Sequence, residues 1–164
     1  MNLSDAMVAE FRHEAQTTRK LLERIPDEKL SFRPHPKSMT MGGLGTHIAH
    51  IPEWAETIVN DRELDMSKTD TRAKERKSRK EILEYFDENV EKFQKILAGK
   101  PDDHLFLTWT LKSGDHVVLT LPRAACLRSF ILSHTIHHRG QLSVYLREND
   151  IPVPSIYGPS ADES

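Results

Sequence analysis

Three histidines, His134, His137 and His138, lie close together in a stretch whose apolar pattern predicts a long helix. His134 and His138 are four residues apart. This spacing places both imidazoles on one face of a helix, about one turn apart, where two neutral rings can share one metal ion. His137 lies about 100° around the helix from His138. We therefore expect His137 to face a neighbouring helix, a partner subunit or solvent.

A metal ion at His134 and His138 needs a third ligand from elsewhere in the chain. The predicted helix over residues 41–60 offers His47 and His50, three residues apart, and spacing alone does not choose between them. Closed structural zinc sites are excluded because the chain has one cysteine. Three histidines with one open position are typical of catalytic metal sites. Residue 135 is Thr, so the Glu of the H-E-x-x-H peptidase motif is absent.

Four predicted helices position these residues. Apolar residues at helical spacing indicate helices over about residues 4–25 and 41–60, a third that opens at Ser78 and ends at Gly99, and a fourth over about 122–149. Ser4, Thr40 and Ser78 are the expected N-caps, and Pro122 suits the first position of the fourth helix. Pro52 falls inside the second helix and predicts a kink there.

The region between the third and fourth helices has a different pattern. Apolar and polar residues alternate over 105–111, Lys112–Asp115 is a turn signal, and residues 116–120 are again strand-like. This indicates a short β-hairpin. We expect loops over residues 26–40 and 68–80, the second of them charged and solvated. The tail from about residue 150 contains three prolines after position 151 and is expected to lie along the surface or fray. The fold class is thus all-α: a four-helix bundle with a short hairpin.

Length and charge narrow the function classes. The 164 residues fit one domain, residues 1–164, and 23 Lys and Arg nearly balance 25 Asp and Glu, which argues against a nucleic-acid or membrane-surface binder. The N-terminus lacks a signal-peptide pattern, and no apolar run approaches the ~20 residues that span a bilayer, so a cytoplasmic protein is expected. Cys126 is expected to be a buried, inert thiol.

The other histidines are expected to play no part in a site. His13, His104 and His116 are predicted surface residues, and His35 is predicted to be a loop residue with a packing or capping role. No residue is a compelling general base. Glu53 and Tyr145 are near the histidine motifs in the sequence, without a defined orientation.

These motifs together resemble the DinB/YfiT-like superfamily. The resemblance covers nearly the whole chain. The matching segments are Arg33–Thr40, Leu44–Ala49 with the first ligand motif, Ser133–Gln141 with the second, and Val153–Glu163 in the tail. The resemblance implies a four-helix DinB-like fold, metal ligands at His47, His134 and His138, nickel or zinc as the ion, and often a homodimer. His50 falls where the family does not place a ligand, so it is expected to be an outer residue.

The resemblance leaves two functional hypotheses. Members of the family include thiol-dependent S-transferases and isomerases, so the first hypothesis is a metal-dependent enzyme. Its three-histidine site would activate a low-molecular-weight thiol, or water in a hydrolase, toward a small electrophile. The second is a non-catalytic metal-binding module with a stress-response or structural role. Stability of the metal-free protein discriminates between them, because chelation unfolds a protein whose metal is structural.

Overall fold

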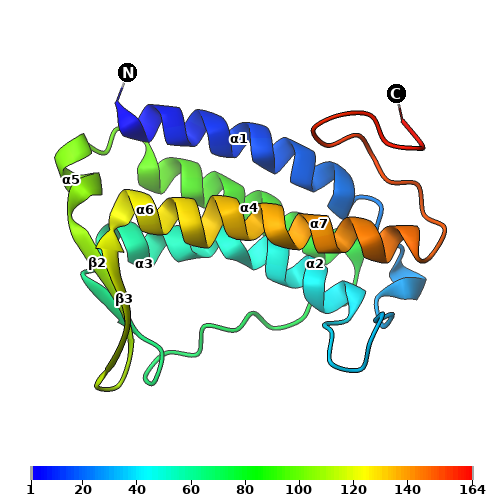
Figure 1. Ribbon diagram of the computed structural model, residues 1–164, viewed down its shortest axis with the longest axis horizontal. Coiled ribbons are helices and arrows are strands. Elements are labelled where there is room, and N and C mark those ends of the chain that lie inside the picture. Colours follow the sequence, from blue (N-terminus) through cyan, green and yellow to red (C-terminus); the bar gives the residue numbers. More distant parts are fainter. Residues whose placement is uncertain (1, 164) are drawn as a thin grey trace.

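A computed structural model of the chain describes residues 2–163. Figure 1 shows long helical segments lying side by side, with a small sheet at one end. The helical elements are α1 (Leu3–Leu22), η1 (Asp27–Lys29), α2 (Met41–His50), η2 (Ile51–Glu53), α3 (Trp54–Asn60), α4 (Arg79–Leu97), α5 (Asp102–Phe106), α6 (Arg123–Leu127), η3 (Arg128–Ser133) and α7 (His134–Arg147). The prediction of a mostly helical chain is confirmed, whereas the exact count of four helices is not.

Two of the expected long helices are divided into consecutive segments. Residues 41–60 form α2, a 3₁₀ turn η2 and α3, and the turn contains Pro52. Proline has no N–H to donate to the carbonyl four residues earlier, so the α-helical hydrogen-bond pattern is interrupted here. The kink of the helix axis at this point stays a prediction. Residues 123–147 form α6, the π-helical segment η3 and α7. Local sequence did not predict the π segment, a feature that often accompanies functional sites.

Two of the three predicted N-caps are found at the starts of their helices. Thr40 accepts a hydrogen bond from the Gly43 N–H, and Ser78 accepts one from the Glu81 N–H, so both predicted N-caps are confirmed. The prediction for Ser4 is wrong, because α1 starts one residue earlier and Asn2 is its N-cap. Ser4 instead lies fully buried inside the first turn.

The ends of the first and last helices also differ from the prediction. Helix α1 ends at Leu22 rather than at Ile25. The next residues form a turn, in which the N–H groups of Arg24 and Ile25 donate hydrogen bonds to carbonyls three residues earlier. Pro122 is the N-cap of α6 rather than its first helical residue. Helix α7 ends at Arg147, two residues before the expected end.

The predicted hairpin is confirmed, and it belongs to a three-stranded sheet. Strands β2 (Thr108–Ser113) and β3 (His116–Pro122) are antiparallel, and Gly114 in the turn has a φ of +58°. Residues 102–106, partly expected as strand, form α5 instead. Strand β1 (Glu63–Asp65) pairs in parallel with β2 and was not predicted. Its three residues, Glu-Leu-Asp, are too few to give a strand signal, and its partner lies far away in the sequence.

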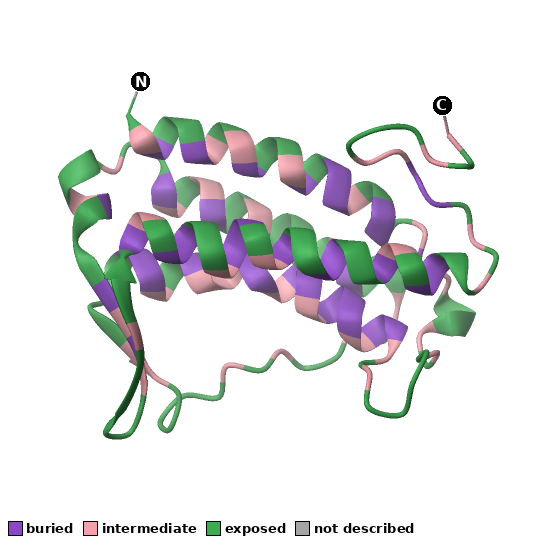
Figure 2. Cartoon of the chain, viewed as in Figure 1, coloured by how far each residue is buried: buried purple, intermediate pink, exposed green. Residues whose placement is uncertain are grey.

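The core lies between the long helices. Figure 2 shows buried residues on their inward faces and exposed residues outside. The predicted stripe of the second helix is buried, including Ile48, Ile51 and Ile58, and Cys126 is fully buried as expected. Its pKa is raised by burial, so the thiol is held in its protonated form. No helix among residues 2–163 is both long and apolar enough to cross a lipid bilayer.

The C-terminal tail is anchored to the helices rather than frayed. Asp162 pairs with Arg147 of α7 and accepts a hydrogen bond from the Val153 N–H. Glu163 pairs with Arg24, which follows α1. The tail therefore lies along the surface, at the end of the molecule where α1 and α7 end (Figure 1).

Candidate metal centre

Three histidine side chains meet between α2 and α7. His47 comes from α2, and His134 and His138 come from α7. The Nε2 atoms of His134 and His138 are 2.8 Å apart, and that of His47 lies 3.3 Å from His134 and 3.1 Å from His138. His138 is buried, and the other two rings are partly buried. The structure therefore brings together the three residues that the family resemblance implied as ligands.

The separations of the three nitrogens match the needs of one metal ion. Zinc–nitrogen bonds of about 2.0–2.1 Å put two ligand nitrogens about 2.9 Å apart at a right angle and about 3.4 Å apart at a tetrahedral angle. The observed separations of 2.8, 3.1 and 3.3 Å are close to this range. Three imidazole nitrogens cannot satisfy one another, because a neutral ring has one donor and one acceptor nitrogen. A divalent cation satisfies all three lone pairs.

A hydrogen bond behind the His138 ring orients it for metal binding. The Nδ1 atom of His138 lies 2.7 Å from Oε1 of Gln141, an acceptor, so Nδ1 carries the proton and Nε2 presents its lone pair. The backbone carbonyl of Phe130, in the π segment, acts on the His134 ring and raises its pKa, against the effect of burial.

Helix α2, which carries His47, packs closely against its neighbours at Gly45. A Cβ atom built on Gly45 would lie 2.8 Å from Cδ1 of Ile25 and 3.2 Å from Cδ1 of Ile82. A larger residue at this position would therefore require the ends of these two side chains to move.

Burial keeps the three imidazoles neutral, as metal ligands must be. Burial, with smaller effects from the neighbouring histidines, lowers the pKa of His47 to about 4. Burial also lowers the pKa of His134 and of His138, and the Phe130 carbonyl and the Gln141 amide oxygen, which favour the protonated rings, offset part of that effect. Neutral rings have lone pairs available for a cation.

The amide of Gln141 should strengthen metal binding. We expect Gln141→Leu to weaken zinc affinity by about 10–100-fold, because the partner that orients a ligand imidazole is lost. Gln141→Glu keeps an acceptor oxygen at this place and should retain most of the affinity. Competition with a chromophoric chelator measures both. Equal affinities of wild type and Gln141→Leu would contradict the role given to this hydrogen bond.

The metal-free protein should lose stability in mild acid. The folded-state pKa of His47 lies near 4, below the unfolded value of about 6.5, so the unfolded chain binds more protons between these values. The contribution of His47 is complete above about pH 6.5 and is lost as the pH falls toward 4. Urea unfolding midpoints at pH 7 and pH 5 test this. His47→Gln should show a smaller difference between the two, and an unchanged difference would refute the assignment.

A cavity of about 350 Å³ lies beside the three rings. His47 and His134 form one side, and Trp54 and Phe130 form an aromatic wall with ring centroids 5.7 Å apart. A further part of the wall comes from residues between Thr71 and Glu75, within the segment between β1 and α4. The prediction that residues 68–80 are a solvated loop is therefore incomplete, because part of this loop encloses the cavity. Sequence patterns gave no signal for this wall.

His50 lies at the cavity but does not join the three converging rings. Its Nδ1 atom is 2.8 Å from the Tyr85 hydroxyl and 3.1 Å from Glu53, and its Nε2 atom is 3.0 Å from the Thr71 carbonyl. The expectation that His50 is an outer residue is thus in accord with its contacts. Tyr145 donates a hydrogen bond to the Met39 carbonyl. Neither Glu53 nor Tyr145 lines the cavity, so the structure supplies no argument for either as a general base there.

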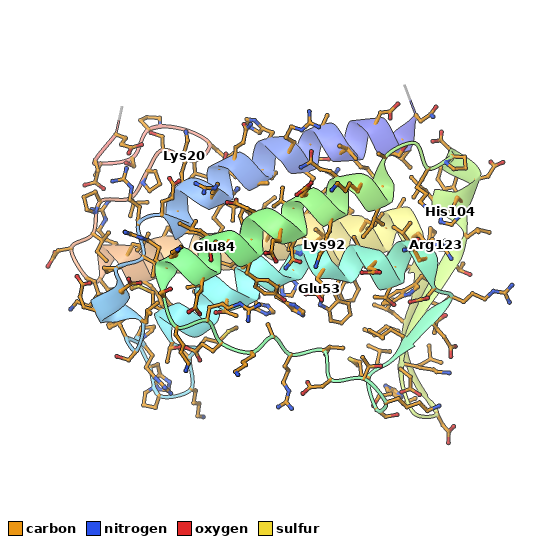
Figure 3. All side chains as sticks on the ribbon, turned by 180° about the vertical axis from the view of Figure 1, so that it is seen from behind. Lys20, Glu53, Glu84, Lys92, His104 and Arg123 are labelled. Atoms are coloured by element: carbon orange, nitrogen blue, oxygen red, sulfur yellow. The ribbon has the colours of Figure 1, made fainter. Side chains whose placement is uncertain are left out.

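The remaining histidines lie outside the site. His13, His35, His116 and His137 are exposed, and Nδ1 of His35 accepts a hydrogen bond from the Lys37 N–H. The prediction for His104 is wrong. Its ring is partly buried, contacts Arg123, and lies 2.8 Å from the Val59 carbonyl at the end of α3. Figure 3 shows His104 and Arg123 together at one end of the molecule, away from Glu53.

The fold and the three-imidazole site define a small helical protein with a candidate metal centre, and comparison with known proteins places it in a family. The family model of the DinB family matches residues 1–164. The chain belongs to the DinB family.

Individual proteins are similar to this chain in sequence or in fold. The uncharacterized protein YrdA of Bacillus subtilis (strain 168) is 26% identical over 160 residues, which cover 97% of this chain and 90% of that protein. A DinB-like protein from Bacillus cereus ATCC 10987 has a similar fold, with a TM-score of 0.75 at 23% identity over 93% of this chain and 97% of the other. The DinB-like protein YjoA from Bacillus subtilis has a TM-score of 0.69 at 22% identity over 97% and 99%.

Proposed function

We propose that this protein is a divalent-metal-dependent enzyme that transfers a small electrophile to a low-molecular-weight thiol, or hydrolyses it with water. The observation that carries the proposal is the convergence of three Nε2 atoms within 3.3 Å beside a cavity of about 350 Å³. His47, His134 and His138 would hold nickel or zinc. A bound divalent ion lowers the pKa of a thiol or water and so supplies a nucleophile near neutral pH.

The walls of the cavity favour a small substrate with an apolar part. Trp54, Phe130 and Met39 offer apolar contact surface, and Gly43 also lines the cavity. The aromatic rings of Trp54 and Phe130 are nearly parallel, at 16°, and present a flat surface. A volume of about 350 Å³ is at the small end of ligand pockets, so a protein or nucleic-acid substrate does not fit inside.

A non-catalytic metal-binding module is the second candidate. The ligands come from α2 and α7, so a bound ion would also link these two helices. In a structural or stress-response role, removal of the ion would unfold the protein. The buried apolar core, which includes residues from every long helix, favours a fold that survives chelation. For either function we also propose a homodimer, which the family resemblance implies, and a cytoplasmic location and four main helices, which the sequence patterns predict.

A thiol-transfer assay tests the enzymatic proposal. Zinc- or nickel-loaded protein is incubated with cysteine, or another low-molecular-weight thiol, and N-ethyl chloroacetamide, and release of chloride is followed. We expect a metal-dependent rate that His134→Ala abolishes and that the exposed His137→Ala leaves unchanged. Rates equal to the His134→Ala background for a panel of thiols and electrophiles, and for hydrolysis, would reject the enzyme in favour of the binding module.

A further inference from the structure

The cavity beside the three histidines borders a second cavity at His50. The second, outer cavity has a volume of about 460 Å³. Three residues line both of them, namely His50, Trp54 and Thr71. The contact between His50 and Thr71 thus lies at the boundary between the two cavities. We call the pair His50 and Thr71 the partition.

The partition is held by one defined hydrogen bond. Nε2 of His50 lies 3.0 Å from the carbonyl oxygen of Thr71. A carbonyl oxygen only accepts, so Nε2 carries a proton and donates it. The His50 side chain is 13% exposed, so this bond is largely shielded from water. It joins α2 to the loop that forms the far wall of the cavity.

Two further side chains fix the other edge of the His50 ring. The Tyr85 hydroxyl is 2.8 Å from Nδ1 and 2.6 Å from Glu53, so its one hydrogen is shared between these two neighbours, while Glu53 itself lies 3.1 Å from Nδ1. Burial and Glu53 raise the pKa of Tyr85 to about 12, so its hydroxyl stays protonated. Arg76 lies over the Tyr85 ring at 4.0 Å. The ring of His50 is therefore braced on both sides.

The loop has few other attachments near Thr71. Residues 66–78 contain no helix or strand, and Glu75 and Arg76 are tied to Thr40 and to Thr46 at the end nearest α4. On either side of Thr71, Arg72 donates a hydrogen bond to Asp70, so this contact joins two residues of the loop itself. Long loops without secondary structure that border a site are often functional. His50 is thus the residue that fastens this part of the wall to the helices.

We propose that His50 is a specificity-determining residue which, by fixing the Thr71 carbonyl, closes the partition and confines the substrate to the inner cavity. The inference rests on the proposed function for the identity of the substrate as a small electrophile. Opening the partition would join the inner cavity to the outer one, whose walls carry the carboxylates of Glu53, Glu56, Asp61 and Asp70. Longer substrates, and those with a cationic end, would then fit.

Backbone hydrogen exchange tests the partition without any reaction. In His50→Leu, which keeps the ring's bulk but not its donor, we expect amides 70–74 to exchange at least tenfold faster than in wild type. Amides of α7 should not change. In His50→Gln, a side-chain N–H again reaches toward Thr71, and exchange should return to within about threefold of wild type. The exposed His137→Leu is the matched control and should behave as wild type.

Substrate length provides the functional readout. The zinc-loaded protein is assayed with cysteine and N-alkyl chloroacetamides from ethyl to octyl, and with an octyl analogue ending in an amine. We expect His50→Leu to raise the ratio of kcat/KM for the octyl to the ethyl substrate at least tenfold, and more for the amine. The shift should appear mainly in KM. His50→Gln should restore the wild-type ratio.

Each outcome decides between the alternatives. Unchanged exchange at residues 70–74 in His50→Leu overturns the partition, as does an unchanged length preference. Loss of bound zinc in His50→Leu would make His50 a ligand and also overturns it. If the wild type shows no metal-dependent transfer, the proposed function fails while hydrogen exchange still decides the partition. Tyr85→Phe, which removes one hydroxyl, provides a milder second variant with the same expected direction, should His50→Leu not fold.

Discussion

Replacing His138 with alanine is expected to abolish stoichiometric binding of zinc or nickel. Nε2 of His138 lies 2.8 Å and 3.1 Å from the other two ligand nitrogens, so its loss leaves only two donors. Structural zinc sites with four ligands bind with about 10–16 kcal/mol, so one ligand contributes about 3 kcal/mol and its removal weakens affinity ~100-fold or more. Metal analysis of dialysed protein should fall from about one ion per chain to nearly none.

A substitution at the adjacent histidine shows whether the loss of metal binding is specific to His138. His137 is adjacent to His138 in the sequence, yet it is exposed and does not join the converging nitrogens. His137→Ala should therefore keep the wild-type metal content, and His47→Ala should behave like His138→Ala. Equal metal content in His137→Ala and His138→Ala would show that the ion is bound elsewhere.

Replacing Arg139 with alanine is expected to lower the free energy of unfolding by about 3–5 kcal/mol. The Arg139 side chain is 1% exposed and its guanidinium lies 2.8 Å from the carboxylate of Glu14, which is 12% exposed. Arg139 also donates to the Tyr157 hydroxyl, which in turn donates to Glu14, so the tail is joined to α1 and α7. Without Arg139, a largely buried carboxylate keeps no cationic partner, and the tail loses an anchor.

An exposed ion pair between α1 and the segment η3, which directly precedes α7, provides the control. Arg128 pairs with Glu10 at 2.6 Å, but the two side chains are 62% and 40% exposed. Exposed pairs contribute about 0–1 kcal/mol, so Arg128→Ala should change stability little. Urea unfolding with matched m-values measures both variants. The double variant Arg139→Met with Glu14→Leu should regain most of the loss, because no unpaired charge remains. Similar stability of the two single alanine variants would contradict the account.

Local patterns predicted the long helices, and tertiary contacts determined where they end. The inner stripe with Ile48, Ile51 and Ile58 is visible as periodicity, and it is buried as expected. The start of α1 was misplaced because the Leu3 N–H donates to Asp102, a residue 99 positions away. Strand β1 was missed for the same reason, since three residues pair with a strand more than forty positions later. The π segment was not predicted either, because its local sequence does not mark it.

The site was predictable to different degrees for its different parts. The i, i+4 spacing of His134 and His138 follows from helix geometry alone. The choice of His47 over His50 required the family resemblance, because both lie on one predicted helix. The structure gives the physical reason: the His50 ring is occupied by Glu53, Tyr85 and the Thr71 carbonyl. The cavity wall could not be predicted, because an irregular loop supplies it.

X-ray absorption at the metal edge of the zinc- or nickel-loaded protein tests the central claim most directly. The claim is that His47, His134 and His138 hold one ion and leave a position open to a small ligand. For zinc, three imidazole nitrogens at about 2.0–2.1 Å and one light atom are expected, with a sulfur at about 2.3 Å replacing the light atom after cysteine is added. A spectrum without imidazole scattering, or one that added cysteine leaves unchanged because a fourth protein ligand closes the site, would contradict it.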